Sequence, residues 1–217
     1  AHWCFQGFPS HTLMYSYRDE GGWHTEQIGH HGRHPHLALD DGTPHMLVSK
    51  SEGQGYKVNY VHESTSGWQI ETLANDSSAN GLAVDSSGQL HGLISAAQGG
   101  VEYWYNDGSG WESEVISATG QGNSHNGTIA VDESGRIHTV YCENSKSDLI
   151  YATKTGSAGW DRSTVYDGST TIPWQTVNLE LVEGSPRITF MSGSDLYYAR
   201  QAIPLQRWGL YRTILIR

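Results

Sequence analysis

The 217-residue sequence has only two cysteines, four lysines and no run of about 18 consecutive apolar residues. Without such a run, no transmembrane helix is predicted. The scarcity of lysine and the formal net charge of -10 disfavour the basic face that nucleic-acid binding requires. Cys4 and Cys142 fall in repeats that are not neighbours, so no disulfide is expected between them.

Glycine and aromatic residues are abundant instead, with 26 Gly, 12 Tyr and 8 Trp. This composition favours a β-rich protein with many turns, and the length allows one large domain or two small ones. The sequence starts at Ala1 and shows no basic and then apolar leader. We therefore expect either a removed signal peptide or a fragment. The sequence leaves the localisation open, and a secreted or extracellular protein is favoured.

Five tryptophans recur at spacings of 45, 43, 49 and 48 residues, namely Trp23, Trp68, Trp111, Trp160 and Trp208. The first four each follow a glycine and precede an aliphatic residue by five positions. A second column, aliphatic-x-Tyr, lies eight to twelve residues before each Trp, at Leu13/Tyr15, Val58/Tyr60, Val101/Tyr103, Leu149/Tyr151 and Leu196/Tyr198. The alternation in this column is typical of strands, so the chain is predicted to repeat one structural unit.

A third element reads as strand, tight turn and strand, as in "LAVDSSGQLH" at 82–91 and "IAVDESGRIH" at 129–138. Each unit is thus about four short strands, and a sheet this small must stack on its neighbours to bury both faces. The pattern predicts an all-β fold, a β-propeller, as a single domain over 1–217. A β-sandwich is disfavoured because it has no reason to repeat three columns in register.

Aligning the repeats gives about five blades of four antiparallel strands, near 1–28, 36–74, 79–116, 126–165 and 178–214. The first blade lacks its inner strand, because His2 aligns with His138 and Tyr15 with Tyr151. An uncovered strand edge at this point favours self-association, so a homo-oligomer that completes the open blade is a predicted partner.

Residues present in every blade are expected to serve the architecture. A histidine follows the turn glycine by three positions at His45, His91 and His138, and His2 aligns with this column. We expect these histidines to form hydrogen bonds within or between blades, and the tryptophans to pack one blade against the next.

The segments that precede each inner strand differ from blade to blade, and they converge near the central channel of a propeller. Variable loops on a constant scaffold are where binding residues gather. The candidate ligand-binding residues are His34, His36, Asn80, His125, Asn126, Trp174, Gln175 and Asn178, with His30, His31 and the cation Arg33 in the same segments. His31, His34 and His36 are also candidate zinc ligands, but without an acidic or Cys partner neither a metal nor another cofactor is expected.

The motif "LAVDSSGQLH…VEYW…GSGW" resembles the blades of sialidase-like or BNR-type propellers, a group that includes lectins, glycosidases and polysaccharide lyases. A glycosidase needs two carboxylates, and the channel segments offer only Asp76 and Glu180. The stretch "SHNGTIAVDESGRIH" resembles ulvan-lyase-like propellers, and this resemblance implies a catalytic role for His125.

Three functions remain open from the sequence. The favoured one is a lectin-like propeller that binds a glycan or polysaccharide through channel-side loops, since aromatic, amide and imidazole groups suit sugars and no catalytic set is evident. The alternatives are a polysaccharide lyase that uses His125 and a non-catalytic scaffold for protein interactions. The sequence leans away from an enzyme.

Overall fold

A computed structural model describes residues 1–7, 11–52, 55–96, 99–118, 126–143, 148–168, 172–173, 176–202 and 207–213. The regular elements of these residues are β-strands in antiparallel sheets, of which one has three strands and four have four. The fold is all-β, and the first sheet has three strands, as the alignment of the repeats predicts. No helix of the described part is long and apolar enough to cross a membrane.

The strands follow the chain order within each sheet. The first sheet is β1 (His2–Gly7), β2 (Thr12–Asp19) and β3 (Gly22–His31), and the second is β4 (Arg33–Asp40), β5 (Thr43–Glu52), β6 (Gly55–Ser64) and β7 (Gly67–Asn75). The third is β8 (Ser78–Val84), β9 (Leu90–Ser95), β10 (Val101–Asn106) and β11 (Trp111–Ser117). The fourth is β12 (Gly127–Val131), β13 (Ile137–Glu143), β14 (Asp148–Lys154) and β15 (Asp161–Asp167). The fifth is β16 (Asn178–Val182), β17 (Ser185–Ser192), β18 (Asp195–Ala202) and β19 (Arg207–Thr213).

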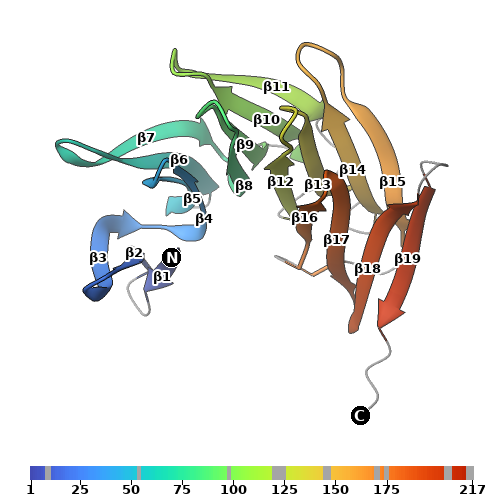
Figure 1. Ribbon diagram of the computed structural model, residues 1–217, viewed down its shortest axis with the longest axis horizontal. Coiled ribbons are helices and arrows are strands. Elements are labelled where there is room, and N and C mark those ends of the chain that lie inside the picture. Colours follow the sequence, from blue (N-terminus) through green and yellow to red (C-terminus); the bar gives the residue numbers. More distant parts are fainter. Residues whose placement is uncertain are drawn as a thin grey trace.

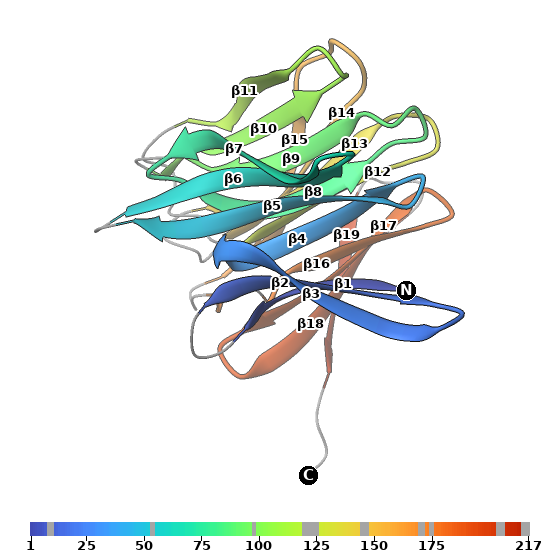
Figure 2. The same ribbon diagram turned by 90° about the vertical axis from the view of Figure 1, so that its left-hand side faces the viewer.

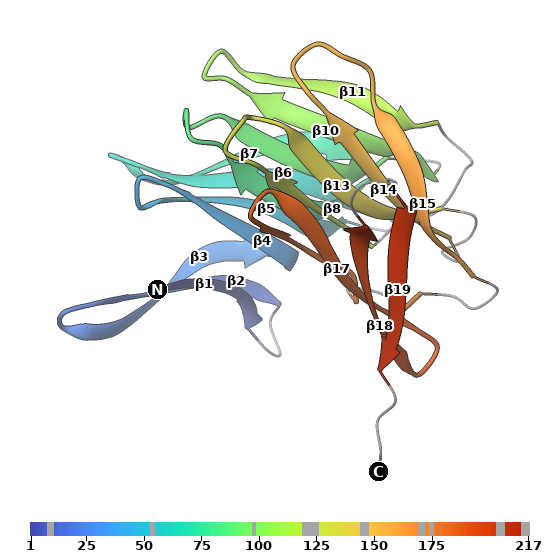
Figure 3. The same ribbon diagram turned by 45° about the vertical axis from the view of Figure 1, so that its right-hand side comes forward.

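The sheets stand side by side along an arc, with β4, β8, β12 and β16 nearest its centre (Figure 1). Neighbouring sheets touch through these inner strands, β4 against β8, β8 against β12 and β12 against β16, and β1 lies against β4. Figure 2 shows the faces of successive sheets stacked on one another. The first and fifth sheets lie at the two ends of the arc, well apart in both Figure 1 and Figure 3.

The hairpin turns use the residues that the sequence places there. Asp41 and Gly42 both have positive φ, at 44° and 85°, and Glu183 and Gly184 repeat this two-residue turn at 51° and 70°. Positive φ at both central positions matches the right-handed twist of the flanking strands. The longer turn closed by Gly88, at φ 79°, lets Asp85 Oδ1 accept hydrogen bonds from the backbone N–H groups of Ser87 and Gln89 within the turn. Each of these turns joins an inner strand, β4, β8 or β16, to the strand that pairs with it.

Apolar clusters fill the four junctions between neighbouring sheets. At each junction a tyrosine from one sheet meets the edge of a tryptophan from the next, with ring centroids 4.9–5.4 Å apart and planes at 71–72°. The pairs are Tyr15–Trp68, Tyr60–Trp111, Tyr103–Trp160 and Tyr151–Trp208. Edge-to-face geometry is favourable for aromatic rings. The predicted role of the tryptophan column in sheet packing is confirmed at these four positions.

The repeated histidines also have the predicted structural role. Each shares a hydrogen bond with the junction tyrosine of its own sheet, from ring Nδ1 to the hydroxyl at 2.6–2.7 Å, in His2–Tyr15, His45–Tyr60, His91–Tyr103 and His138–Tyr151. His138 Nε2 also contacts Asp132 Oδ2 at 3.2 Å. The hydrogen bond thus fixes the tyrosine ring against the tryptophan of the next sheet. The two cysteines are free.

Stability is expected to fall on both sides of neutral pH. Burial lowers the pKa of His45, His91 and His138 below 6.5, and it raises the pKa of Tyr60, Tyr103 and Tyr151 above 10. Below about pH 6.5 the unfolded chain therefore binds more protons than the folded chain, and above about pH 10 it releases more. Urea unfolding should give a lower midpoint at pH 5 and at pH 10.5 than at pH 8. A constant midpoint from pH 8 to 5 would contradict the burial of neutral histidines.

Candidate functional site

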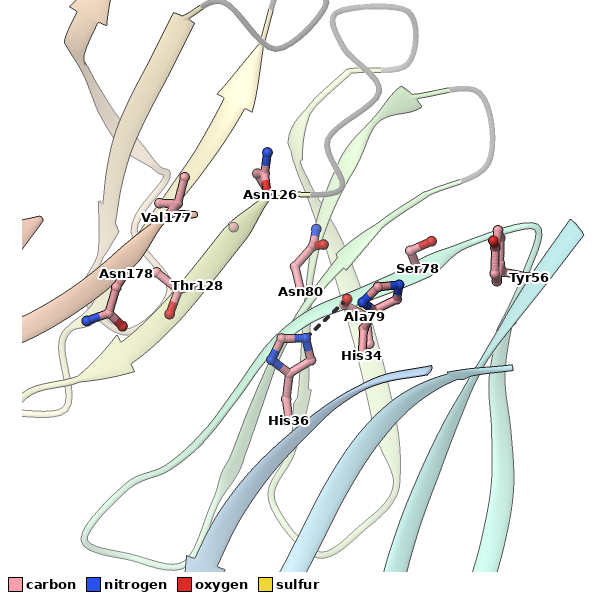
Figure 4. A pocket seen from close by; sticks show the side chains of 11 residues that line it. His34, His36, Tyr56, Ser78, Ala79, Asn80, Asn126, Thr128, Val177 and Asn178 are labelled. Atoms are coloured by element: carbon pink, nitrogen blue, oxygen red, sulfur yellow. Dashed lines mark hydrogen bonds between the residues drawn. The ribbon is translucent and has the colours of Figure 1, made fainter. Parts of the chain in front are cut away.

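A cavity of about 250 Å³ opens among the inner strands of the arc (Figure 4). Its walls come from the second to fifth sheets, mainly from β4, β8, β12 and the start of β16. The lining residues are His34, His36, Tyr56, Ser78, Ala79, Asn80, Asn126, Gly127, Thr128, Val177 and Asn178. The cavity is smaller than the roughly 300–1,000 Å³ typical of drug-sized ligands. It suits a ligand of one or two rings.

Five of the eight candidate binding residues meet at this cavity, although they lie in segments up to 144 positions apart. They are His34, His36, Asn80, Asn126 and Asn178. The other three, His125, Trp174 and Gln175, lie outside the described residues, as do the side chains of His30 and His31. The segments that vary between repeats therefore do converge at the centre of the arc.

Irregularities in the inner strands turn the candidate side chains into the cavity. The pairing of β4 with β5 shifts register between Arg33 and His36, and His34 has φ 51°. The pairing of β8 with β9 shifts between Ala79 and Gly81, on either side of Asn80. A bulge of this kind re-aims a side chain that would alternate in a regular strand.

His36 ties two walls of the cavity together. Its Nε2 donates to the carbonyl oxygen of Ala79 at 3.3 Å, which links β4 to β8 (Figure 4). Burial, with a smaller repulsion from His34, lowers the pKa of His36 to about 4, against the opposing effect of the Ala79 hydrogen bond. His36 is therefore neutral at physiological pH.

Asn80 and Asn126 are almost fully buried, at 3% and 1% exposure, and their amide nitrogens bond within the protein. The Asn80 Nδ2 donates to Ser95 Oγ at 2.6 Å. The Asn126 Nδ2 donates to the carbonyl oxygens of Ile172 at 3.1 Å and Pro173 at 2.8 Å. Both side chains thus shape the wall. His34, Tyr56, Thr128 and Asn178 are more accessible and are the groups best placed to contact a ligand.

Tyr56, Ser78 and Thr128 line the cavity but were not among the candidate residues from the sequence. Ser78 and Thr128 fall in the variable segments, so their position was a usable signal. Tyr56 belongs to β6, a strand of the repeated scaffold, and lies two residues before the aliphatic-x-Tyr column. No feature of the sequence points to it, because its place at the cavity depends on how the start of β6 lies beside the segment before β8, where the Ser77 N–H donates to the Tyr56 carbonyl oxygen at 3.0 Å.

The lining carries no carboxylate, lysine, arginine or cysteine among the described residues. Asp76 lines a neighbouring hollow with Lys57 and Asn75, which shares Tyr56 with the cavity, and Glu180 is exposed on β16. The two carboxylates that glycosidases place across the scissile bond are therefore not present in the described cavity walls. Nor does the described part contain three histidine, cysteine or acidic side chains grouped to hold a metal ion. Of the candidate zinc ligands, His34 and His36 line the cavity and the side chain of His31 lies outside the described residues.

No protein-family model matches the sequence. No curated protein sequence matches it either.

Several solved structures have a similar fold. A mutant of the lectin from Aleuria aurantia, in complex with α-methyl-L-fucoside, shares 13% identity and a TM-score of 0.69 over 97% of this chain and 76% of its own. AofleA from Arthrobotrys oligospora shares 10% identity and a TM-score of 0.62, over 93% of this chain and 64% of its own. A putative 6-phosphogluconolactonase from Bacteroides uniformis shares 7% identity and a TM-score of 0.63, over 98% of this chain and 67% of its own.

These similarities show the β-propeller fold. The Aleuria aurantia lectin is described as a six-bladed β-propeller that recognises fucose. At 7–14% identity the fold alone is shared, and the function must be argued from the cavity. The resemblance to sialidase-like or BNR-type blades stays a prediction.

Proposed function

We propose that this chain binds a neutral sugar in the cavity at the centre of the arc. The observation that carries the proposal is the convergence of five imidazole and amide side chains, contributed by the second to fifth sheets, on one cavity whose described lining has no carboxylate, lysine or arginine. Each comes from a segment that varies between otherwise regular repeats. His36, Asn80 and Asn126 form hydrogen bonds that build the cavity wall, and His34 and Asn178 are the more accessible members, so these two are the proposed ligand contacts.

The chemistry of the lining favours hydroxyl groups as the feature recognised. Imidazole, amide and hydroxyl side chains donate and accept hydrogen bonds without charge, and the ring of Tyr56 offers an apolar face for sugar C–H groups. An anionic sugar would find no arginine or lysine in the described walls, and burying its carboxylate without a partner is costly. Neutral hexoses and deoxyhexoses are therefore favoured over uronates and sialic acids.

The similar folds give a first ligand to test. The Aleuria aurantia lectin binds α-methyl-L-fucoside and a fucose-α1,6-linked disaccharide, both uncharged. We propose a lectin role for this chain, either alone or as the recognition module of a larger protein. Catalysis by His125 is a separate hypothesis from the sequence, and no described contact favours it.

Calorimetric titration with L-fucose, D-galactose and D-glucuronate tests the proposal. We expect binding of a neutral sugar that weakens about tenfold or more in His34→Gly and in Asn178→Ala, since each change removes one or two hydrogen bonds. Glycine suits the positive φ of His34, so the first change adds no backbone strain.

His24→Ala serves as the matched control, because His24 lies on the outer hairpin of the first sheet, where it contacts Asp19. This variant should bind as tightly as the unchanged chain, and all three variants should keep the original thermal midpoint. Binding that survives both cavity changes would move the site elsewhere. Preference for D-glucuronate would contradict the neutral-sugar proposal.

A further inference from the structure

A tyrosine–tryptophan pair joins the two sheets at each of the four junctions of the arc. On its outward face, each end sheet carries only one residue of such a pair. Trp23 holds the tryptophan position in the first sheet, but the described residues place no preceding sheet against it. Trp23 is 54% exposed, whereas Trp68, Trp111, Trp160 and Trp208 are all partly buried. Tyr198 holds the tyrosine position in the fifth sheet, and its ring contact is with Tyr211 of the same sheet. Within the described residues, no tryptophan of a following sheet covers it.

The open face of the first sheet is markedly apolar. Trp3 is 62% exposed and Phe5 42%, and together with Trp23 they line a shallow hollow floored by Ser16 and Thr25. Three large aromatic side chains on one sheet face form an exposed apolar patch of the kind that marks an interaction surface. On every inner sheet, the equivalent face is covered by the preceding sheet.

The open face of the fifth sheet carries exposed apolar and aromatic side chains as well. By strand register Tyr198 lies beside Tyr211, and Leu196 lies on the same face two residues earlier. Tyr211 is 48% exposed, and Leu196 and Val182 are each 42% exposed. Arg200 lies on the same face and contacts the Tyr211 ring. By register Glu180, Arg187 and Arg200 also share this face, so charged groups lie beside its aromatic and aliphatic ones, and Tyr198 holds the tyrosine position of the second to fourth sheets.

We propose that both open faces are docking surfaces for a further four-stranded sheet of this same repeat. Its tyrosine packs on Trp23 of the first sheet, and its tryptophan packs on Tyr198 of the fifth sheet. The argument is the fourfold recurrence of one junction geometry, with each end face supplying the half that the other lacks. The proposed occupant is therefore a sheet that presents a tyrosine on one face and a tryptophan on the other.

Two other occupants fit less well. Direct contact between the fifth and first sheets would need all four packed junctions to change, because these sheets lie at opposite ends of the arc (Figure 3). Tightly packed junctions resist such deformation. A second copy that placed its fifth sheet on Trp23 would still leave Tyr198 of the first copy uncovered. A single additional sheet covers both open faces without changing the packed junctions.

The test extends the full chain by one repeat. A copy of residues 119–168, which comprises a connecting segment and the β12–β15 sheet, is added after Arg217. We expect the thermal midpoint to rise by several degrees and acrylamide quenching of Trp23 to fall several-fold relative to the unextended chain. The Trp23 signal is obtained as the difference between each protein and its Trp23→Phe variant.

The controls separate docking from the mere presence of extra chain. Tyr151→Ala and Trp160→Ala, made only within the added copy, should abolish both the rise in midpoint and the protection of Trp23. An extension that leaves Trp23 fully quenchable overturns the proposal. So does an unextended chain in which Trp23 is already protected: as a sedimenting monomer it would indicate closure by the fifth sheet, and as a dimer it would indicate a second copy.

Discussion

Trp160→Ala should lower the free energy of unfolding by about 3 kcal/mol, measured by urea denaturation at pH 8. Trp160 packs edge-on against Tyr103 of the preceding sheet, with ring centroids 5.4 Å apart. Its Nε1 donates to Glu114 Oε1 at 2.7 Å, and the Lys154 ammonium lies 5.9 Å from its ring. The substitution therefore removes an aromatic pair, a hydrogen bond and a cation–π contact at a single junction, and it leaves space that the rigid sheets cannot close.

Trp23→Ala is the matched control, because the same residue type occupies the same repeat position without a preceding sheet. Trp23 is 54% exposed, so its removal should change the free energy of unfolding by no more than about 0.5 kcal/mol. Equal losses from the two variants would mean that tryptophan stabilises its own sheet rather than the junction. That outcome would also undermine the docking faces inferred at the ends of the arc.

The repeat made much of the fold predictable. Trp68 and Trp111 lie one repeat apart, as do Tyr60 and Tyr103. This spacing reports contacts between sheets, because a tyrosine–tryptophan pair recurs wherever two sheets meet. The alignment of His2 with His138 predicted a first sheet without its inner strand, and the hydrogen bond from His2 to Tyr15 repeats that from His138 to Tyr151. Such contacts can be recognised in the sequence of a stacked-repeat protein because every unit packs against neighbours of the same kind.

The convergence of the variable segments on one cavity was predictable, and the binding role of their residues stays a prediction. The segments that differ between repeats contain His34, Asn80 and Asn178, and all three line the cavity. These segments can be recognised because the rest of each repeat keeps the same residue types at the same positions. The sequence could not show that Tyr56 reaches the cavity, because this depends on the path of a scaffold strand. The sequence also could not separate residues that build the cavity wall from residues that stay accessible within it, because burial and hydrogen bonding depend on the folded chain.

Asn126 shows this distinction and is expected to be the most sensitive residue of the cavity wall. Its side chain is 1% exposed and donates to two backbone carbonyls, those of Ile172 and Pro173. Asn126→Ala leaves both acceptors without this donor in a buried setting, and each unsatisfied group costs about 1–3 kcal/mol. We expect a total loss of about 2–3 kcal/mol in the free energy of unfolding. Asn126→Asp should be at least as harmful at neutral pH, since a carboxylate would then face two carbonyl oxygens.

Measuring both the urea midpoint and the sugar affinity of a variant distinguishes residues that build the cavity wall from the proposed ligand contacts. In Asn126→Ala, sugar binding should weaken together with a lower urea midpoint, because the segment at 172–173 loses its anchor to β12. In Asn178→Ala, binding should weaken while the midpoint stays unchanged, because Asn178 is exposed at the start of β16. If Asn126→Ala kept its full stability and lost only binding, the amide would be a direct ligand contact, and the internal hydrogen bonds to Ile172 and Pro173 would not be its main role.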